Sequence, residues 1–344
     1  MSRWWFYLAV LGGAALTSWA LSFFVRVLAR RFGALDLPDT GRKRHAGPIP
    51  LLGGLAVWGS VLAAAVFLWN TGWLPDAHST ARVLAAAGLG SAVLMAVGFI
   101  DDRFRLPPMA QLFGPLLAAT IVLAGGVRIE LVTNPFGGVL FVPWWLAGSL
   151  TFIWLVGMMY TTKLLDGLDG LVSSISAIGG LIIFGVSLAW DAPSAATGVL
   201  ALAFAGSCIG FLPHNLNPAR LFLGEGGSVF TGFTLGLLAI VSGSKITTAL
   251  LVMGVPVADA AWVIIERIRH GAGVTRGDRR HLHFRLIERG WSPRQVVALL
   301  SSLSAGFGMT ALVASPKGKL AALAALVLLV TWLLRWSRKP RSIS

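Results

Sequence analysis

Two adjacent carboxylates, Asp101 and Asp102, follow directly after the apolar run AVGFI. Desolvation and mutual repulsion make such a pair costly at a membrane edge unless a metal or another cation offsets the charge. A helix cap is the plainer alternative, because Asp is favoured at helix ends, although capping needs one Asp rather than two.

A second acidic segment, TTKLLDGLDGL at residues 161–171, places Asp166 and Asp169 three positions apart. In a helix this spacing puts both carboxylates on one face, and the glycine after each one lets a ligand approach the backbone. A glycine-broken turn with solvated acids is equally compatible with the segment.

Glu225 lies among Gly224, Gly226 and Gly227, immediately before an apolar stretch. A helix N-terminus with a glycine-rich backbone is a natural anion site. A carboxylate beside an anion site makes sense if Mg²⁺ lies between the two, with Mn²⁺ as the alternative ion. A glycine-rich helix cap is the simpler interpretation.

Basic residues and histidines gather in two further segments. The first, DLPDTGRKRHAGPIPLLGG, contains Lys43 and His45 and is suited either to capturing an anionic head group or to setting topology. The second, RIRHGAGVTRGDRRHLHFRLIERG, contains Arg279, His281 and His283, and its charge suits phosphates or anionic lipid. The two histidines share a face only if the backbone is extended. The nearby acids fit Mg²⁺ better than zinc.

The elements that position these residues are expected to be membrane-spanning helices. Hydrophobic residues make up 56% of the 344 positions and charged residues 12%, and a spanning helix needs about 20 apolar residues. Apolar stretches of this kind are centred near residues 15, 60, 91, 118, 152, 180, 204, 235, 256, 305 and 327. We therefore expect an all-α polytopic membrane protein with about eleven transmembrane helices.

The charge distribution predicts the orientation of these helices. Most Lys and Arg residues fall on one side if the segment after the first helix faces the cytoplasm, which follows the positive-inside rule. The N-terminus then lies outside and the C-terminus inside, and residues 128–142 form a small outer-face β-hairpin. The net charge of +14 is explained by topology, so no nucleic acid is expected as a partner.

The chemistry-bearing residues all fall in connections on the predicted cytoplasmic face. These connections comprise residues 29–50, 101–110, 161–170, 214–227 and 267–296. None of them is long enough to fold separately, so residues 1–344 are expected to form a single integral membrane domain. Paired acids, glycine-rich turns and Arg/His clusters on one face indicate phosphoryl chemistry on a charged substrate.

The chain resembles the polyprenyl-phosphate N-acetylhexosamine-1-phosphate transferases, which include phospho-N-acetylmuramoyl-pentapeptide transferase. The resemblance covers residues from about 36 to 290. It is carried, in order, by DLPDTGRKRHAGPIPLLGG, GFIDD followed by LPP, LLDGLDGL, NLNPARLFLGEGGS, PVAD and DRRHLHFRL. The HLH pattern is nearer to the N-acetylglucosamine-type branch.

The resemblance implies a reaction and a set of site residues. The enzyme would move an N-acetylhexosamine 1-phosphate, here expected to be N-acetylglucosamine 1-phosphate, from a UDP-sugar to undecaprenyl or another polyprenyl phosphate with Mg²⁺. This step releases UMP and initiates cell-envelope glycan or polysaccharide synthesis. A homodimer is compatible with the resemblance. The implied catalytic residues are Asp101 and Asp102, with Glu225 as the metal ligand. The expected substrate-binding residues are Lys43, His45, Lys163, Asp166, Asp169, Asn215, Arg279, His281 and His283.

Three positions depart from the family pattern. The family usually has Asp at the position of Glu225, Asn at that of Lys163 and Lys at that of Gln111. Glu225 still offers an oxygen ligand, and Lys163 either replaces the charge missing at Gln111 or alters substrate choice. Because of these departures, an inactive relative of the enzymes is one alternative interpretation of the protein. A membrane transporter that uses acids at the membrane interface is the other.

Overall fold

The computed structural model of the chain describes residues 3–37, 47–74, 78–134, 136–190, 195–243, 246–269 and 280–337. Lys43, His45 and Arg279, which the sequence predicts to bind substrate, lie outside these described residues.

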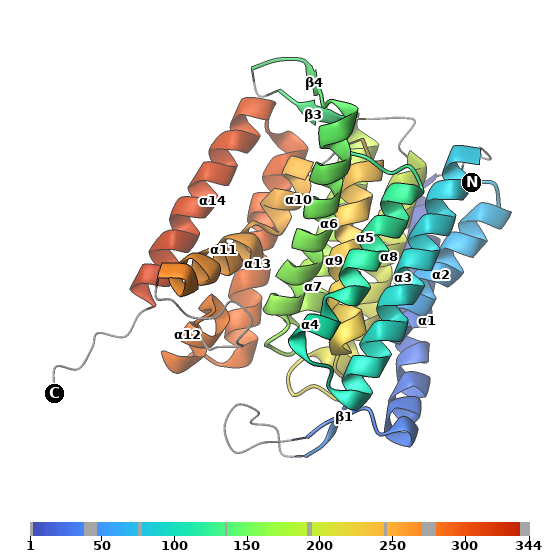
Figure 1. Ribbon diagram of the computed structural model, residues 1–344, viewed down its shortest axis with the longest axis vertical. Helices are drawn as coiled ribbons and strands as arrows, with labels where there is room; N and C mark the ends of the chain where they lie inside the picture. Colours follow the sequence, from blue (N-terminus) through green and yellow to red (C-terminus); the bar gives the residue numbers. More distant parts are fainter. Residues whose placement is uncertain are drawn as a thin grey trace.

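Helices make up most of the described chain (Figure 1). The first half contains α1 (Arg3–Phe32), α2 (Gly54–Asn70), α3 (His78–Phe104), α4 (Pro108–Gln111), α5 (Phe113–Ala124), α6 (Trp144–Leu165) and α7 (Leu171–Trp190). The second half contains α8 (Ala195–Asn215), α9 (Gly224–Val241), α10 (Ile246–Val252), α11 (Gly254–Arg269), α12 (Leu282–Glu288), α13 (Pro293–Val313) and α14 (Pro316–Trp336).

The expected all-α polytopic membrane architecture is confirmed. Within the described residues, eight helices are long and apolar enough to cross a membrane, and the bent pair α10 and α11 makes a ninth candidate. Two shorter apolar segments, Gly54–Asn70 and Pro108–Ala124, fall where the sequence predicts further spans. Helices form here because a chain in lipid must satisfy its backbone hydrogen bonds internally.

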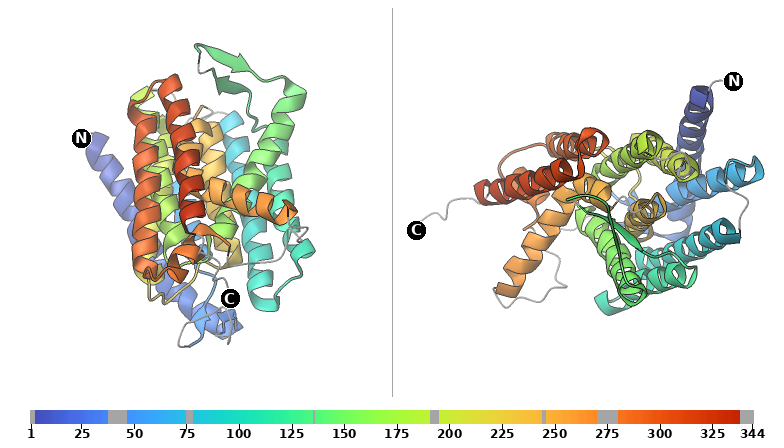
Figure 2. Two further views of the ribbon diagram at one scale, coloured as in Figure 1. Left: turned by 90° about the vertical axis from the view of Figure 1, so that its left-hand side faces the viewer. Right: turned by 90° about the horizontal axis from the view of Figure 1, so that it is seen from above.

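One predicted span is not a straight helix. The stretch centred near residue 256 divides at Met253 into α10 and α11, which are bent by 77° relative to one another. Gly254 begins α11 and Pro256 lies in its first turn, where the missing N–H of proline costs no helical hydrogen bond. The bend directs α11 away from the bundle (Figures 1 and 2).

Helix α9 lies inside the bundle, in contact with α2, α3, α6 and α7 (Figure 2). Nearly every residue from Gly224 to Ile240 is buried, as expected for a helix that is apolar on all sides. Close approach depends on glycine, as at small-residue interfaces between membrane helices. A Cβ on Gly98 of α3 would collide with Gly226 of α9, and one on Gly54 of α2 would collide with Gly227.

Two small antiparallel sheets lie at opposite ends of the bundle (Figure 1). Strands β3 (Leu131–Thr133) and β4 (Val139–Phe141) form the hairpin that the sequence predicts. Strands β1 (Leu35–Asp36) and β2 (Ile49–Pro50) pair at the other end and were not anticipated. Phe222 donates its backbone N–H to the Pro50 carbonyl at 2.9 Å, which ties this second sheet to the segment before α9.

Candidate functional site

The described segments that carry the predicted site residues lie together at the end of the bundle opposite the β3–β4 hairpin (Figure 1). The end of α3, helix α4, the α6–α7 turn, the α8–α9 connection and α12 meet there. Direct contacts join these segments, although up to about 180 residues separate them in sequence. We call Asp101, Asp102, Asp166, Asp169 and Glu225 the acidic cluster.

Asp102 holds the N-terminus of α9. Its Oδ1 accepts the backbone N–H of Glu225 at 2.9 Å. Gly224 has φ +74°, and a Cβ at that position would collide with Asp102 Oδ2. Asp102 therefore caps α9 from the end of α3 rather than capping a helix of its own, and this contact brings its carboxylate beside Glu225.

Asp101 also makes local hydrogen bonds, so both members of the pair support the backbone. Its Oδ1 accepts the N–H of Leu106 at 2.6 Å and the Nε2 of Gln111 at 3.2 Å. Asp101 is buried. These contacts fix the turn between α3 and α4 and hold Gln111 against the acidic cluster.

Lys163 supplies a cation within the acidic cluster. Its ammonium pairs with the Glu225 carboxylate and donates to Gln111 Oε1 at 2.8 Å. Both Lys163 and Glu225 are about one-fifth exposed. All three departures from the family pattern thus meet, because Lys163 places its charge against both Glu225 and Gln111.

The α6–α7 segment is a turn, so the premise of one shared helical face is wrong for Asp166 and Asp169. Asp166 caps the end of α6 with ψ 56°. Asp169 Oδ2 accepts from Asn217 Nδ2 at 2.9 Å and from the Ala219 N–H at 3.0 Å. Gly170, directly before α7, has φ +81°, a conformation that glycine adopts without strain.

The pKa of Asp166 is raised above its usual value by the protein packed around it and by the charges of Glu225 and Asp169. The side chain keeps contact with solvent, which limits the size of the shift. Asp166 therefore lies within electrostatic range of Glu225, while Asp169 is tied to the α8–α9 connection.

Asn215 uses its amide within the protein. Its Oδ1 accepts from Ser173 Oγ at 2.9 Å and its Nδ2 donates to the Leu221 carbonyl at 3.1 Å. The side chain is buried. Asn215 therefore holds the connection that leads to Glu225, and its role toward a substrate stays a prediction.

His281 and His283 share a face, as an extended backbone at the first of them allows. His281 precedes α12 with φ −62° and ψ 146°. The two rings stack with centroids 5.6 Å apart and planes inclined by 8°. A Cβ on Gly167 would collide with His283 Nε2, so the histidine segment packs directly on the α6–α7 turn.

Asp259 positions this segment and was not among the predicted site residues. Its Oδ2 lies 2.9 Å from His281 Nδ1 and its Oδ1 accepts the Leu282 N–H at 2.8 Å. Asp259 is buried in α11. The sequence does contain a signal for this role, because Asp259 lies inside an apolar stretch. A carboxylate in such surroundings needs a hydrogen-bond donor or a cation beside it.

The donor chemistry of the acidic cluster fits Mg²⁺ held jointly with a phosphate ligand. No three His, Cys, Asp or Glu side chains among the described residues form a preformed metal cage. Mg²⁺ is commonly bound by one or two carboxylates together with substrate phosphates and water. The pairing of Lys163 with Glu225 shows that a positive charge is accommodated at this position.

Comparisons with known proteins show which sequences the chain is similar to. A family profile described as glycosyl transferase family 4 matches residues 84–243. A probable undecaprenyl-phosphate N-acetylglucosaminyl 1-phosphate transferase of Bacillus subtilis (strain 168) is 30% identical to the chain, over 87% of this chain and 82% of the relative.

Two further relatives have similar names. A decaprenyl-phosphate N-acetylglucosaminephosphotransferase of Mycolicibacterium smegmatis is 33% identical, over 85% of this chain and 78% of the relative. An undecaprenyl-phosphate alpha-N-acetylglucosaminyl 1-phosphate transferase of Escherichia coli (strain K12) is 27% identical, over 84% and 79%. The chain therefore belongs to glycosyl transferase family 4, the family of polyprenyl-phosphate N-acetylhexosamine-1-phosphate transferases that its motifs resemble.

Proposed function

We propose that the protein transfers N-acetylglucosamine 1-phosphate from UDP-N-acetylglucosamine to a polyprenyl phosphate such as undecaprenyl phosphate and releases UMP. The convergence of the acidic cluster, Lys163 and the His281/His283 pair at one end of the bundle carries this proposal. The names of the relatives support the sugar and the lipid. In the cell the product would begin a cell-envelope glycan or polysaccharide.

Charge neutralisation is the central requirement of this reaction, because a lipid phosphate and a nucleotide diphosphate repel one another. Glu225, with Asp102 and Asp166 nearby, would hold Mg²⁺. When bound, that ion would neutralise diphosphate oxygens and favour departure of UMP. Lys163 adds a protein cation at the same place.

The bond changes follow from the products. A phosphate oxygen of the lipid forms a bond to the β-phosphorus of the UDP-sugar, and the bond from that phosphorus to the oxygen bridging the two phosphates breaks. The electron pair leaves with UMP. Asp101 or Asp102 would orient or deprotonate the acceptor, and an Asp nucleophile is the alternative to direct transfer.

The remaining residues have positioning roles in this proposal. Asp259 fixes His281 through its Nδ1, and His281 in turn stacks on His283. We propose that this pair lines the nucleotide-sugar cleft, together with Asn215, Asp169 and the predicted residues Lys43, His45 and Arg279. The site would face the cytoplasm in a single-domain protein of eleven spans, with its N-terminus outside.

The test is UMP release by the purified protein in detergent with undecaprenyl phosphate, UDP-N-acetylglucosamine and Mg²⁺. Glu225→Gln is expected to lower the rate by about 100-fold or more, since removing one electrostatic stabiliser of a transition state costs about 10²–10³ in rate. The matched control is Glu130→Gln, at the far end of the bundle. Full activity of Glu225→Gln would remove the metal assignment. Absence of UMP release with every UDP-sugar would favour an inactive relative or a transporter.

A further inference from the structure

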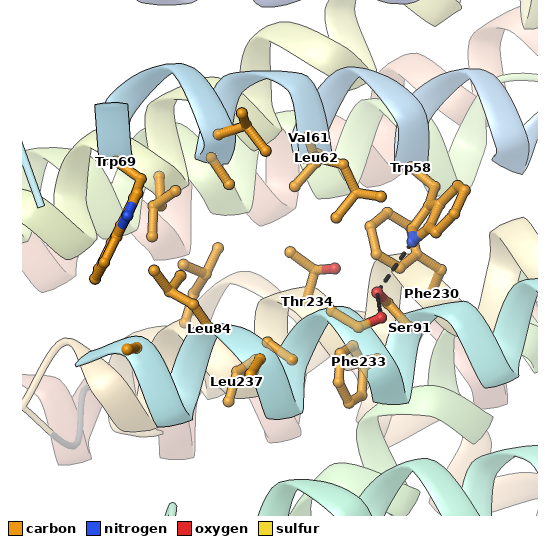
Figure 3. Close-up of a pocket in the computed structure, with 18 residues that line it drawn as sticks. Trp58, Val61, Leu62, Trp69, Leu84, Ser91, Phe230, Phe233, Thr234 and Leu237 are labelled. Carbon is orange, nitrogen blue, oxygen red and sulfur yellow. Dashed lines mark hydrogen bonds between the residues drawn. The ribbon is translucent and has the colours of Figure 1, made fainter. Parts of the chain in front are cut away.

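A cavity of about 420 Å³ lies between α2, α3 and α9 (Figure 3). It shares no lining residue with the acidic cluster. Its walls include Trp58 and Trp69 of α2, Leu84 and Gly88 of α3, and Phe233 and Leu237 of α9. Ser91 and Thr234 contribute the only hydroxyl groups among the lining residues. Its volume falls in the range of about 300–1,000 Å³ that is usual for ligand pockets.

The cavity is closed toward the acidic cluster. At that end α2 and α3 both press against α9, through Gly54 on Gly227 and Gly98 on Gly226, where no side chain fits. Trp58 Nε1 then donates to Ser91 Oγ at 3.0 Å and joins α2 to α3. Figure 3 shows this hydrogen bond at one end of the cavity and Trp69 at the other.

The opposite end reaches the lipid-facing surface. Val66 and Ala85 line the cavity and are also exposed. An apolar cavity does not hold water well, and the helices around it are those of a membrane protein. A hydrocarbon chain from the bilayer is therefore the ligand that suits these apolar walls.

A positive charge at the open end of the cavity indicates which head group the hydrocarbon chain carries. Arg82 is exposed in the first turns of α3 and follows the lining residue Ala81. A guanidinium at a bilayer interface pairs well with phosphate oxygens. Nearby, Trp73 stacks on Phe6 of α1 with ring centroids 3.6 Å apart, in the manner of aromatic residues at a membrane interface.

We propose that this cavity holds an acyl chain of a phospholipid from the leaflet farther from the acidic cluster, with the lipid phosphate against Arg82. The bound chain wedges between α2 and α3 and holds both on α9. This matters for the site because Gly53 and Gly54 donate to the carbonyls of Phe222 and Leu223, next to Glu225, at 2.8 Å each.

The polyprenyl chain of an acceptor does not fit the same cavity. Its phosphate must reach the acidic cluster, and the glycine crossings and the Trp58–Ser91 hydrogen bond close that route. The cavity is therefore a phospholipid site, separate from the reaction.

Gly88 provides the test, because a Cβ at this lining position meets nothing within 4 Å. Gly88→Leu fills the cavity. The matched control is Gly306→Leu on α13, another helical glycine with open space around its Cβ. Each protein is purified in mild detergent, retained phospholipids are counted by native mass spectrometry, and the increase in unfolding temperature caused by added phosphatidylglycerol is recorded.

We expect the unaltered protein and Gly306→Leu to retain one phospholipid and to be stabilised by phosphatidylglycerol, whereas Gly88→Leu loses both properties. Arg82→Gln serves as an independent variant and is expected to weaken the effect of phosphatidylglycerol several-fold. Equal lipid retention by Gly88→Leu and Gly306→Leu would overturn the proposal. Displacement of the retained lipid by undecaprenyl phosphate would also overturn it, because the cavity would then belong to the acceptor.

Discussion

At the scale of single residues, the acidic cluster is balanced by one lysine. Lys163 contacts both Glu225 and Gln111, and Gln111 in turn donates to Asp101. The sequence allowed Lys163 to replace a charge missing at Gln111, and the geometry is consistent with that idea. The ammonium thus connects α6 to the start of α9 and, through Gln111 of α4, to the end of α3.

Lys163→Met is expected to destabilise the protein when divalent cations are removed. A partly buried hydrogen bond between charged groups is worth about 1.5–3 kcal/mol, and its loss leaves the carboxylates to repel one another. Mg²⁺ should therefore raise the unfolding temperature of Lys163→Met more than that of the unaltered protein. Lys317→Met, at the far end of the bundle, should respond like the unaltered protein. An equal response of all three to Mg²⁺ would mean that Lys163 does not offset the cluster.

Asp259→Asn is expected to disturb His281 without touching the acidic cluster. Each oxygen of Asp259 now faces one nitrogen, either His281 Nδ1 or the Leu282 N–H. Asn has only one side-chain oxygen, so one of these two buried nitrogens loses its acceptor, at a cost of about 1–3 kcal/mol. UMP release should fall about 10-fold or more, mainly through KM for the UDP-sugar. Glu266→Gln, which breaks the ion pair with Arg285 on the same two helices, is the control. An unchanged KM in Asp259→Asn would separate His281 from the nucleotide-sugar cleft.

At the scale of elements, glycine sets how closely the helices that carry the carboxylates approach one another. Gly98 lies one turn before Asp102, and Gly226 directly follows Glu225. The contact between these two glycines brings the end of α3 against the start of α9. A change in this crossing therefore moves both carboxylates.

Gly98→Ala is expected to lower both stability and activity. The added Cβ collides with the α9 backbone, and overpacking of this kind costs about 1–3 kcal/mol. Gly88→Ala, on the same helix but with open space around its Cβ, should be neutral or stabilising by up to about 1 kcal/mol. Unfolding temperature and UMP release should be measured for both variants. A Gly98→Ala protein as active as Gly88→Ala would show that the crossing tolerates separation.

The elements themselves followed from local sequence, whereas their bends and contacts did not. Apolar runs predicted the helices, and turn residues predicted the β3–β4 hairpin. The bend at Met253 and the β1–β2 pair depend on partners elsewhere in the fold, such as Leu326 beside Gly254 and Phe222 beside Pro50. The pairing of Asp169 with Asn217 likewise joins residues 48 positions apart. Periodicity carries no information about such contacts.

At the scale of the whole molecule, the fold separates two ends with different chemistry. The acidic cluster and both histidines lie at one end, and the β3–β4 hairpin lies at the other (Figure 1). The positive-inside pattern of the sequence predicts that the acidic end faces the cytoplasm. UDP-sugars are charged, so the side on which the site opens decides which pool of substrate it can use.

Cysteine labelling in intact cells should confirm this orientation. The native Cys208 is buried and does not interfere. Phe136→Cys, in the hairpin, should react with a membrane-impermeant maleimide, whereas Leu216→Cys, beside the acidic cluster, should react only after permeabilisation. Both side chains are exposed in the structure, at 82% and 47%. Reaction of Leu216→Cys in intact cells would place the site on the outer face and remove its access to cytoplasmic UDP-sugar.

The enclosure of α9 has a consequence for how the protein is made. The helices that surround α9 include α2, α3, α6 and α7, all of which are synthesised before it. Until α9 arrives, these neighbours must leave a space among them in the bilayer, with Gly54 and Gly98 facing no partner. A nascent chain that stops short of residue 224 therefore lacks both the helix at the centre of the bundle and the Glu225 carboxylate of the acidic cluster.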